Sequence, residues 1–301
     1  MGRLTAIVLG AAAGGGYPQW NCRCDVCRLA WERDVRVRPR TQASLAVSAD
    51  GEHWVLLNAS PDLRAQLADT RALQPRAGLR DSPIAAVVLT GAEVDQVAGL
   101  LTLRERQSFT VFATAETLAA LAANPIFDVL AADLVTRTAV GCFQPFALPG
   151  GLIAELFAVP GKVALYLEDA EPALAAETGA NVGVELVWGP HRLAYVPGAA
   201  GVTAAMRARL ARADVVVFDG TLFNDDEMIR TGTGAKTGRR MGHMPIAGES
   251  GTLAALAGLP GRRILTHINN TNPILVEGSA ERRQVEAAGF EVAEDGMEIV
   301  L

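Results

Sequence analysis

Three of the four cysteines of the chain, Cys22, Cys24 and Cys27, stand within one stretch of six residues. Thiolates with this C-x-C-x-x-C spacing can surround one tetrahedral metal ion such as Zn²⁺. We predict that Cys22 and Cys24 present their sulfur atoms from a turn. Cys27 is expected in the first turn of a helix, whose N-terminus favours the thiolate. Three unrelated buried cysteines or a catalytic cysteine are the alternatives, but no histidine or asparagine signature accompanies a nucleophile here.

Candidates for a fourth ligand to these sulfur atoms lie in three other segments. Cys142 stands in the stretch AVGCFQPF, which is typical of an ordinary core cysteine. His243 precedes an expected helix, and Asn269 and Asn270 form a polar loop after an expected strand. The residue types alone leave the choice between these candidates open.

A second group of polar side chains follows the ends of expected strands, where functional groups of α/β proteins gather. Oxygen and nitrogen donors of this kind suit a borderline or hard divalent ion. They stand after the strands at 84–90, 214–218 and 262–265 and before the helix at 248–256: Glu93, Asp95, Gln96, Asp219, His267 and His243. These residues form a second candidate metal and catalytic site.

Members of this second group also have purely structural interpretations. Asp95 is typical of a helix cap and Asp219 of a turn. His267 follows an apolar strand and equally suits a structural histidine. Of the four histidines, His53 and His191 stand beside expected hairpin turns and are predicted to lie on the surface. A zinc site with three histidine ligands is therefore hard to assemble.

Arg36, Arg38 and Arg40 alternate in the segment DVRVRPRTQ. In an extended chain this alternation places three guanidinium groups on one face. Guanidinium groups are well shaped to bind carboxylates, so the segment is a candidate anion-binding site. A solvated loop is the alternative interpretation.

The elements that must position these groups combine β-hairpins with strand–helix units. Turns at Asp50-Gly51 and Gly189-Pro190 predict two hairpins. Strands are expected over 4–10, 84–90, 214–220 and 262–270, helices over 93–107, 203–213 and 248–259, and a final helix–strand pair over 281–301. This mixture predicts one α/β domain over residues 1–301 with mixed sheets, in which the segment 168–179 is a loop or short helix.

The composition restricts the classes of function. Half of the 301 residues are hydrophobic, and the formal net charge of −6 disfavours binding to nucleic acid or to an anionic membrane. No stretch of about 20 apolar residues occurs, and the apolar N-terminal run is too short to span a bilayer. We therefore predict a cytoplasmic protein, in which clustered cysteines indicate a metal more than a disulfide.

Long stretches of the chain resemble one protein family. They include VLGAAAGGGYPQWNCRCDVC, RVRPRTQASLAVS, SPIAAVVLTGAEVDQVAGLLTLRE, FDGTLFNDDEMI, KTGRRMGHMPIAGESGTLAAL and HINNTNPIL. With these motifs the chain is similar, from Ile7 nearly to its end, to the coenzyme PQQ (pyrroloquinoline quinone) synthesis protein B family of the metallo-β-lactamase superfamily. The resemblance implies an α/β fold of the metallo-β-lactamase type, an αββα sandwich of two mixed β-sheets flanked by helices.

The metal motif of that superfamily, H-x-H-x-D-H after a strand, is largely replaced in this chain. Asp95 fits the aspartate of the motif, and His267 matches a later histidine ligand. The resemblance therefore implies a single ion held by Asp95, Asp219 and His267, with Gln96 as a weak fourth donor, and not a two-zinc hydrolase site. Five ligand positions hold other residues: Gly91, Glu93 and Gln96 in the motif, Gly161 at the third histidine and Gly198 at the bridging aspartate.

The family is linked to the making of PQQ from a precursor derived from glutamate and tyrosine. The resemblance implies a hydroxylation of the tyrosine ring that depends on iron and O₂, with Fe²⁺ as the active-site metal and Zn²⁺ or Mn²⁺ as substitutes. His243, in GHMP, would transfer a proton or hydrogen-bond a phenolic oxygen. Four basic residues would face the carboxylates of the substrate: Arg36, Arg38, Arg40 and Lys162.

Two alternatives to an oxygenase stay open at this point. One is a non-catalytic carrier that takes part in transport of PQQ or its precursor to the periplasm, and the other is a metal-dependent hydrolase. The expected partners are a small-molecule or dipeptide precursor of PQQ, PQQ itself and other proteins of the pathway. The resemblance also leaves room for a homodimer.

For the cysteines, the resemblance implies a structural Zn²⁺ in an N-terminal knot over residues 14–31, which pins the glycine-rich first loop beside the active site. In a related phosphodiesterase branch of the superfamily, the fourth ligand is a histidine three residues after the one matched by His267. That position holds Asn270 in this chain. The fourth ligand is therefore Asn270, His243 or a water molecule.

Overall fold

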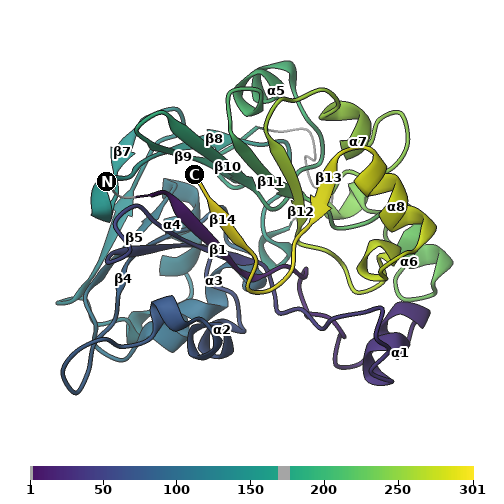
Figure 1. The fold of residues 1–301 in the computed structure, drawn as a ribbon. Coiled ribbons are helices and arrows are strands. Elements are labelled where there is room, and N and C mark those ends of the chain that lie inside the picture. The colour runs from purple at the N-terminus through teal and green to yellow at the C-terminus, as the bar shows by residue number, and fades with distance from the viewer. Residues whose placement is uncertain (1–2, 169–176) are drawn as a thin grey trace.

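Two seven-stranded β-sheets form the centre of the molecule, and helices lie on their outer sides (Figure 1). The structure is a computed structural model that describes residues 3–168 and 177–301. Most of the segment predicted over 168–179 to be a loop or short helix therefore lies outside the described residues.

The first sheet is antiparallel at one end and parallel at the other. The antiparallel pairs include the hairpin predicted at Asp50-Gly51, where Gly51 has a positive φ of 73°. Parallel pairing begins between β3 and β4 and continues to the edge. In spatial order the strands are β14 (Glu298–Val300), β1 (Thr5–Gly10), β2 (Ser44–Ser48), β3 (Trp54–Leu57), β4 (Ile84–Val88), β5 (Phe109–Ala113) and β6 (Val135–Ala139).

The second sheet repeats this mixture of pairings. The hairpin predicted at Gly189-Pro190 joins β9 and β10, and parallel pairing runs from β10 to β13. In spatial order the strands are β13 (Phe290–Val292), β12 (Arg262–Thr266), β11 (Val215–Asp219), β10 (His191–Val196), β9 (Val182–Trp188), β8 (Ile153–Ala158) and β7 (Phe146–Ala147).

The helices are short. The helix predicted over 93–107 is α-helical only over its first turn and continues as a 3₁₀ helix, Ala98–Leu103. No helix of the described residues is long and apolar enough to cross a membrane. The α-helices are α1 (Asp25–Trp31), α2 (Leu63–Asp69), α3 (Val94–Val97), α4 (Ala115–Ala122), α5 (Ala204–Leu210), α6 (Glu227–Arg230), α7 (Thr252–Ala255) and α8 (Ala280–Ala287).

Alternation of side chains along the strands separates three hydrophobic layers. On β11, Val215 and Val217 point into a core shared by both sheets, whereas Val216 and Phe218 pack on the other face against Met206 of α5. A third layer lies between the first sheet and helices α2 and α4. Successive side chains of a strand face opposite sides, so these apolar strands are buried on both faces. The layers confirm the predicted αββα sandwich of two mixed sheets flanked by helices.

Polar segments from both sheets meet where the parallel strands end. The residues after β11 and β12 are joined by backbone bonds, from Gly220 N to Thr266 O (2.7 Å) and from Asn269 N to Thr221 O (2.9 Å). The glycine-rich first loop joins them through Ala13 N and Ile268 O (2.9 Å). The topology thus brings residues from distant parts of the sequence to one edge of the sandwich.

Candidate functional site

Asp219 is the buried anchor of the site at this edge. It ends β11 with no exposed surface, and its Oδ2 accepts hydrogen bonds from the backbone N of Ala199 (2.8 Å) and from His243 Nδ1 (2.7 Å). Its Oδ1 accepts from the backbone N (3.0 Å) and the Oγ1 (2.6 Å) of Thr221. These contacts fix one carboxylate at the strand end and orient one imidazole toward it.

His267 links the second sheet to the first. Its Nε2 is 2.8 Å from Asp95 Oδ2, and its Nδ1 is 2.8 Å from Thr221 Oγ1. The backbone of His267 has a φ of 56°, a left-handed conformation that residues with side chains adopt rarely and mostly at functional sites. The rings of His243 and His267 stack with their centroids 5.1 Å apart. Four predicted residues thus form one connected group.

The charges of this group favour ionised carboxylates. Burial alone would raise the pKa of Asp95, but the hydrogen bond and positive charge of His267 outweigh burial and lower it. Burial would likewise raise the pKa of Asp219, whereas the charge and hydrogen bond of His243 lower it overall. For His267, burial favours the neutral ring, and the bonded Asp95 carboxylate nevertheless raises its pKa. Two carboxylates held in their charged form attract a cation.

The donor atoms are close enough to share one metal ion. One ligand atom each from Asp219, His243 and His267 lies within 4.8 Å of the others, and Asp95 is hydrogen-bonded to this set. Imidazole nitrogen with carboxylate oxygen is the donor chemistry of non-haem iron sites and of many zinc sites. The residues at this position therefore fit a single divalent ion.

A cavity of about 670 Å³ opens beside the group, a size typical of small-molecule sites. Of the residues predicted for this site, those that line the cavity are Glu93, Asp95, Gln96, Lys162, His243 and His267. Asp219 lies behind the wall, since it has no exposed surface. The structure therefore brings the predicted metal and proton-transfer residues together around a space that a small molecule can enter.

Gln96 lines the cavity, but its side-chain oxygen is engaged in a helix cap. Gln96 Oε1 accepts a hydrogen bond from Glu93 N (3.1 Å) at the start of α3. A side chain at Gly91 would meet the same oxygen at 2.6 Å. Glu93 and Gln96 therefore form the helix cap that was predicted for Asp95, and the Asp95 carboxylate is free to bind His267.

Other former ligand positions of the superfamily are filled by groups of the chain itself. A Cβ atom at Gly161 would lie 2.1 Å from Asn181 Nδ2, which donates a hydrogen bond to Gly198 O (3.1 Å). Asn181 thus occupies the room between the third histidine position and the bridging aspartate position. A second metal ion has no histidine or carboxylate ligands at these two glycines.

The three arginines do not reach the cavity. Arg36 pairs with Asp34 (2.8 Å), and Arg38 lies near Glu277 and Glu294. Arg40 is buried and bonds Ala293 O (3.0 Å) and Glu294 (3.2 Å). The three guanidinium groups therefore do not form one free face toward the cavity, because Arg36 pairs with Asp34 and both Arg38 and Arg40 contact Glu294.

Lys162 is the one of the four predicted anion-binding residues that lies at the cavity. Its Nζ is 3.0 Å from Glu93 Oε1 and also pairs with Glu168. Burial would lower the pKa of Lys162, but these two carboxylates raise it overall. Its ammonium group is therefore charged and already partnered at the cavity wall.

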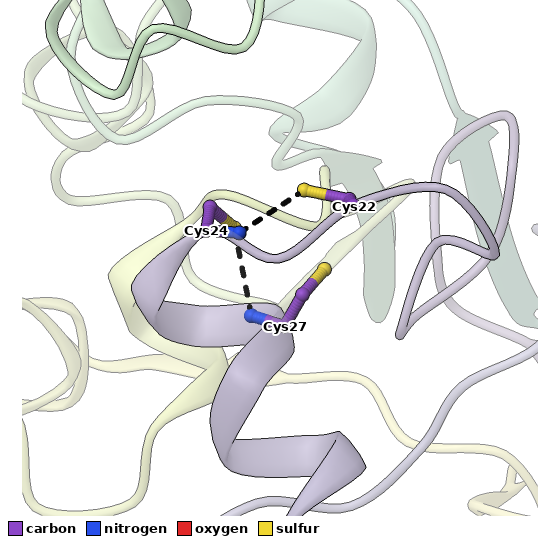
Figure 2. Close-up of side chains that lie close together, drawn as sticks. All are labelled: Cys22, Cys24 and Cys27. Carbon is purple, nitrogen blue, oxygen red and sulfur yellow. Dashed lines mark hydrogen bonds between the residues drawn. The ribbon is translucent and has the colours of Figure 1, made fainter.

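The cysteine cluster lies at the start of α1 (Figure 2). Cys24 N donates to Cys22 Sγ (3.4 Å), and Cys27 N donates to Cys24 Sγ (3.5 Å). As predicted, Cys22 and Cys24 lie in the turn before α1, and Cys27 lies in the first turn of the helix. All three sulfur atoms lie within 4.8 Å of one another. Asn270 is the neighbour from the far end of the chain, with its Nδ2 3.2 Å from Cys27 Sγ.

The residues of this cluster fit a thiolate-bound ion. The hydrogen bond between Cys24 and Cys27 raises the pKa of Cys24 and lowers that of Cys27, as expected of two thiols that share a proton. His243 is bonded instead to Asp219, and Cys142 packs on the core between the sheets. Of the predicted fourth ligands, Asn270 is the side chain that contacts the sulfur atoms.

Sequence reasoning missed three residues of the site. Thr221 bridges Asp219, His243 and His267 through one hydroxyl group. Asn181 fills the Gly161 position, and Asn269, which was expected among the polar groups after the strand at 262–265 but was given no role at the active site, lines the cavity. A threonine two residues after a strand-end aspartate was the available signal for Thr221, but it is a weak one.

Comparisons with known proteins agree with this architecture. A family model for the beta-lactamase superfamily domain matches residues 53–268. Coenzyme PQQ synthesis protein B of Methylobacterium nodulans is 59% identical over 299 residues, which cover 99% of this chain and 100% of that protein. The protein of the same name from Rhizobium meliloti is 57% identical over 99% of this chain and 98% of its own length.

Solved structures give the same relationship. The crystal structure of Zn²⁺-bound PqqB from Methylobacterium extorquens matches with a TM-score of 0.97 and 55% identity, over 99% of this chain and 100% of that chain. A diphosphatase of the PhnP family, with a TM-score of 0.69 and 19% identity, covers 99% of this chain and 97% of that chain and shares the fold.

Fold, strand-end site and family match together define a member of the beta-lactamase superfamily. Within that superfamily, the chain belongs to the coenzyme PQQ synthesis protein B family. The family and the fold predicted from the sequence are therefore confirmed.

Proposed function

We propose that this protein acts in the biosynthesis of PQQ, as the name of its relatives indicates, and that it hydroxylates the tyrosine ring of a precursor derived from glutamate and tyrosine. The observation that carries the proposal is the joined group of two imidazoles and two carboxylates beside a cavity of about 670 Å³. A metal site that opens into a small-molecule cavity suits the oxidation of a dipeptide-sized substrate.

In this proposal Asp95, Asp219 and His267 hold the active-site ion, which we assign as Fe²⁺, and Zn²⁺ or Mn²⁺ can occupy the same place. A redox-active ion supplies electrons to O₂, which otherwise reacts slowly with closed-shell organic molecules. His243 donates Nδ1–H to Asp219, so its Nε2 carries the lone pair that can accept a proton released in the reaction. The zinc reported for the relative from Methylobacterium extorquens supports a metal.

Lys162 orients the substrate through a carboxylate. Its position at the cavity wall beside Glu93 and Glu168 lets a substrate carboxylate compete for the same ammonium group. Because both protein carboxylates already neutralise Lys162, an incoming carboxylate must displace at least one of them.

The experiment that tests the oxygenase is a single-turnover assay. The protein is loaded anaerobically with Fe²⁺, the metal content is verified, and O₂ is added with a Glu–Tyr or Glu–DOPA dipeptide and ascorbate, a two-electron reductant that balances release of the second oxygen atom as water. Mass spectrometry should detect a product that has gained one oxygen atom. The zinc-loaded protein is the control, because Zn²⁺ has no redox chemistry. A verified iron-loaded sample that yields no product contradicts the proposal.

A non-catalytic carrier for PQQ or its precursor, acting in transport to the periplasm, is the second candidate function. It is favoured by the glycines, together with Glu93 and Gln96, that the resemblance places at the metal-ligand positions of the superfamily. Calorimetry with metal-free protein separates the two functions: a carrier binds PQQ without metal and yields no hydroxylated product. The same replacements argue against a hydrolase with two zinc ions.

Three further assignments complete the proposal. The three cysteines with Asn270 hold a structural Zn²⁺, which gives one tightly bound zinc per chain that survives purification. The partners are the dipeptide-like precursor, PQQ itself and other proteins of the pathway. The protein acts in the cytoplasm, where thiols stay reduced and able to bind zinc.

A further inference from the structure

Asn269 presents an amide group at the cavity wall, two residues after His267. Its backbone N is held by Thr221 O (2.9 Å), and its side chain is 8% exposed. The side-chain Nδ2 donates to Thr271 Oγ1 (2.6 Å). No hydrogen bond among the described residues is donated to Asn269 Oδ1, and Asn269 lines the cavity. A bound molecule can therefore donate a hydrogen bond to it.

Glu227 controls the other end of this contact. Its Oε1 is 2.6 Å from Thr271 Oγ1, and its Oε2 accepts the backbone N–H of Phe223 (2.7 Å). The side chain lies on α6 and is 4% exposed. Glu227, Thr271 and Asn269 thus form a chain of hydrogen bonds that runs from the interior to the cavity.

The direction of these hydrogen bonds follows from the number of protons that each group can donate. A threonine hydroxyl has one proton to donate and lone pairs to accept with, whereas an ionised carboxylate only accepts. Thr271 must therefore donate to Glu227 and accept from the amide NH₂ group of Asn269. The amide is left with its NH₂ group inward and its carbonyl oxygen toward the cavity, in agreement with the observed contacts.

We propose that Glu227 is a positioning residue that fixes Asn269, through Thr271, so that Asn269 Oδ1 accepts the phenolic O–H of the substrate. This inference rests on the proposed function, since it takes the tyrosine ring as the ligand. It adds a specificity element that neither metal nor cation provides, because a phenol can donate this hydrogen bond and a methyl ether cannot.

A neutral side chain at position 227 should reverse the donor and acceptor roles of these hydrogen bonds. In Glu227→Gln, the side-chain oxygen keeps the bond from Phe223 N, and the new NH₂ group donates to Thr271. The Thr271 hydroxyl is then free to donate to the Asn269 carbonyl, which turns the NH₂ group of Asn269 toward the cavity. The cavity would present a donor in place of an acceptor, with no change in its size.

The protonation of Glu227 itself supports such a reversal. Burial raises the pKa of Glu227 to about 7, partly offset by the hydrogen bonds from Thr271, Phe223 N and Asn224 N and by the charge of Arg230 on the same helix. Binding should therefore be measured at pH values above this pKa, where the Glu227 carboxylate is ionised and Asn269 Oδ1 faces the cavity.

The test compares two ligands that differ by one donor, Glu–Tyr and its O-methyltyrosine analogue. Calorimetry on wild-type protein should show the phenol bound about tenfold more tightly than the ether, the value of roughly one hydrogen bond. In Glu227→Gln the ratio should approach one, because a phenol oxygen and an ether oxygen both accept from an NH₂ group, and in Thr271→Val it should also fall toward one. Glu249→Gln, at an exposed site, should leave the ratio unchanged.

A readout without any ligand separates this inference from the proposed function. In wild-type protein, nuclear Overhauser effects should connect the Asn269 amide protons with the Thr271 methyl group, and Glu227→Gln should abolish them. An amide that keeps its orientation in the folded Glu227→Gln variant overturns the positioning role. Equal binding of phenol and ether by a wild-type protein that still hydroxylates Glu–Tyr overturns the acceptor role and leaves the oxygenase intact.

Discussion

The cysteine cluster and the cavity cluster both contact the short loop 267–270, but they are built in opposite ways. His267 belongs to the cavity cluster, and Asn270, three residues later, contacts the cysteines. The cysteines come from one stretch of six residues at the start of α1. The cavity cluster draws its groups from segments that are up to 172 residues apart in the chain.

The two clusters also differ in what holds them together without a metal. Each imidazole of the cavity cluster has a carboxylate partner at 2.7 or 2.8 Å, and Thr221 connects the pairs. The cysteine cluster has only long contacts to sulfur, between 3.2 and 3.9 Å. Hydrogen bonds to sulfur are weak, so under the proposed assignments we expect the cysteine cluster to depend on its ion for stability and the cavity cluster to need its ion for chemistry.

The largest effect should come from the cysteine side of this comparison. Cys24→Ser should release the structural zinc and lower the free energy of unfolding by more than about 3 kcal/mol, because a structural metal ion binds only the folded chain. Metal analysis and chemical denaturation measure both quantities. Cys142→Ser is the matched control, since Cys142 lies outside the cluster. A wild-type protein that is fully folded without zinc contradicts the assignment.

Asp95→Asn is expected to act in the opposite way to Cys24→Ser, with a loss of activity but no loss of the structural zinc. This variant should lower hydroxylation at least about 100-fold through loss of the active-site ion, as loss of a ligand exceeds the usual outer-shell effect. The structural zinc should stay, and the free energy of unfolding should change by less than about 1 kcal/mol, because the amide can still accept a bond from His267. Asp69→Asn, at an exposed position on α2, is the control. Retained activity after Asp95→Asn removes Asp95 from the ligand set.

A buried carboxyl on the far side of the loop adds a pH-dependent term that belongs to neither cluster. The pKa of Glu227 is raised by burial from 4.5 to about 7, so the folded chain binds this proton more tightly than the unfolded chain. The contribution is therefore complete below pH 4.5 and is lost as the pH rises through about 7, by on the order of 3 kcal/mol.

Denaturation curves between pH 5 and 8 test this sign against Glu227→Gln, which has no proton to lose. Asp295, whose pKa burial raises to about 6, contributes in the same direction in both proteins. The difference between the two curves therefore isolates Glu227. Wild-type and variant stabilities that run parallel over this range contradict the prediction.

Features that depend on neighbouring residues could be predicted from the sequence. The turn residues at 50–51 and 189–190 predict both hairpins, and the cysteine spacing predicts the turn and helix that carry the sulfur atoms. Strand β6 was missed, because Val135–Ala139 is a half-exposed edge strand without a clear apolar pattern. The helix at 248–259 proved short, since Gly251 packs against the Ala247 carbonyl, 2.2 Å from where a Cβ would stand.

Features that depend on distant partners could not be predicted. The arginine alternation indicates one cationic face, but Arg40 bonds Glu294 and Ala293, which are more than 250 residues away. The strand-end positions of Asp219 and His267 were predictable, whereas their shared contact with Thr221 requires the order of the parallel strands. The order of the strands follows from the fold family, and no local sequence pattern predicts it.

The smallest effect distinguishes the lysine at the cavity from the arginines outside it. Lys162→Met should raise the KM for the dipeptide about tenfold, because it removes the ammonium group and leaves Glu93 and Glu168 to repel a substrate carboxylate. Arg38→Met should leave KM unchanged, since Arg38 is 68% exposed and faces Glu277 and Glu294. Steady-state kinetics at two salt concentrations measure both, and added salt should shrink the wild-type advantage. A larger effect at Arg38 than at Lys162 would restore the arginines as the substrate-binding group and place the carboxylate outside the cavity.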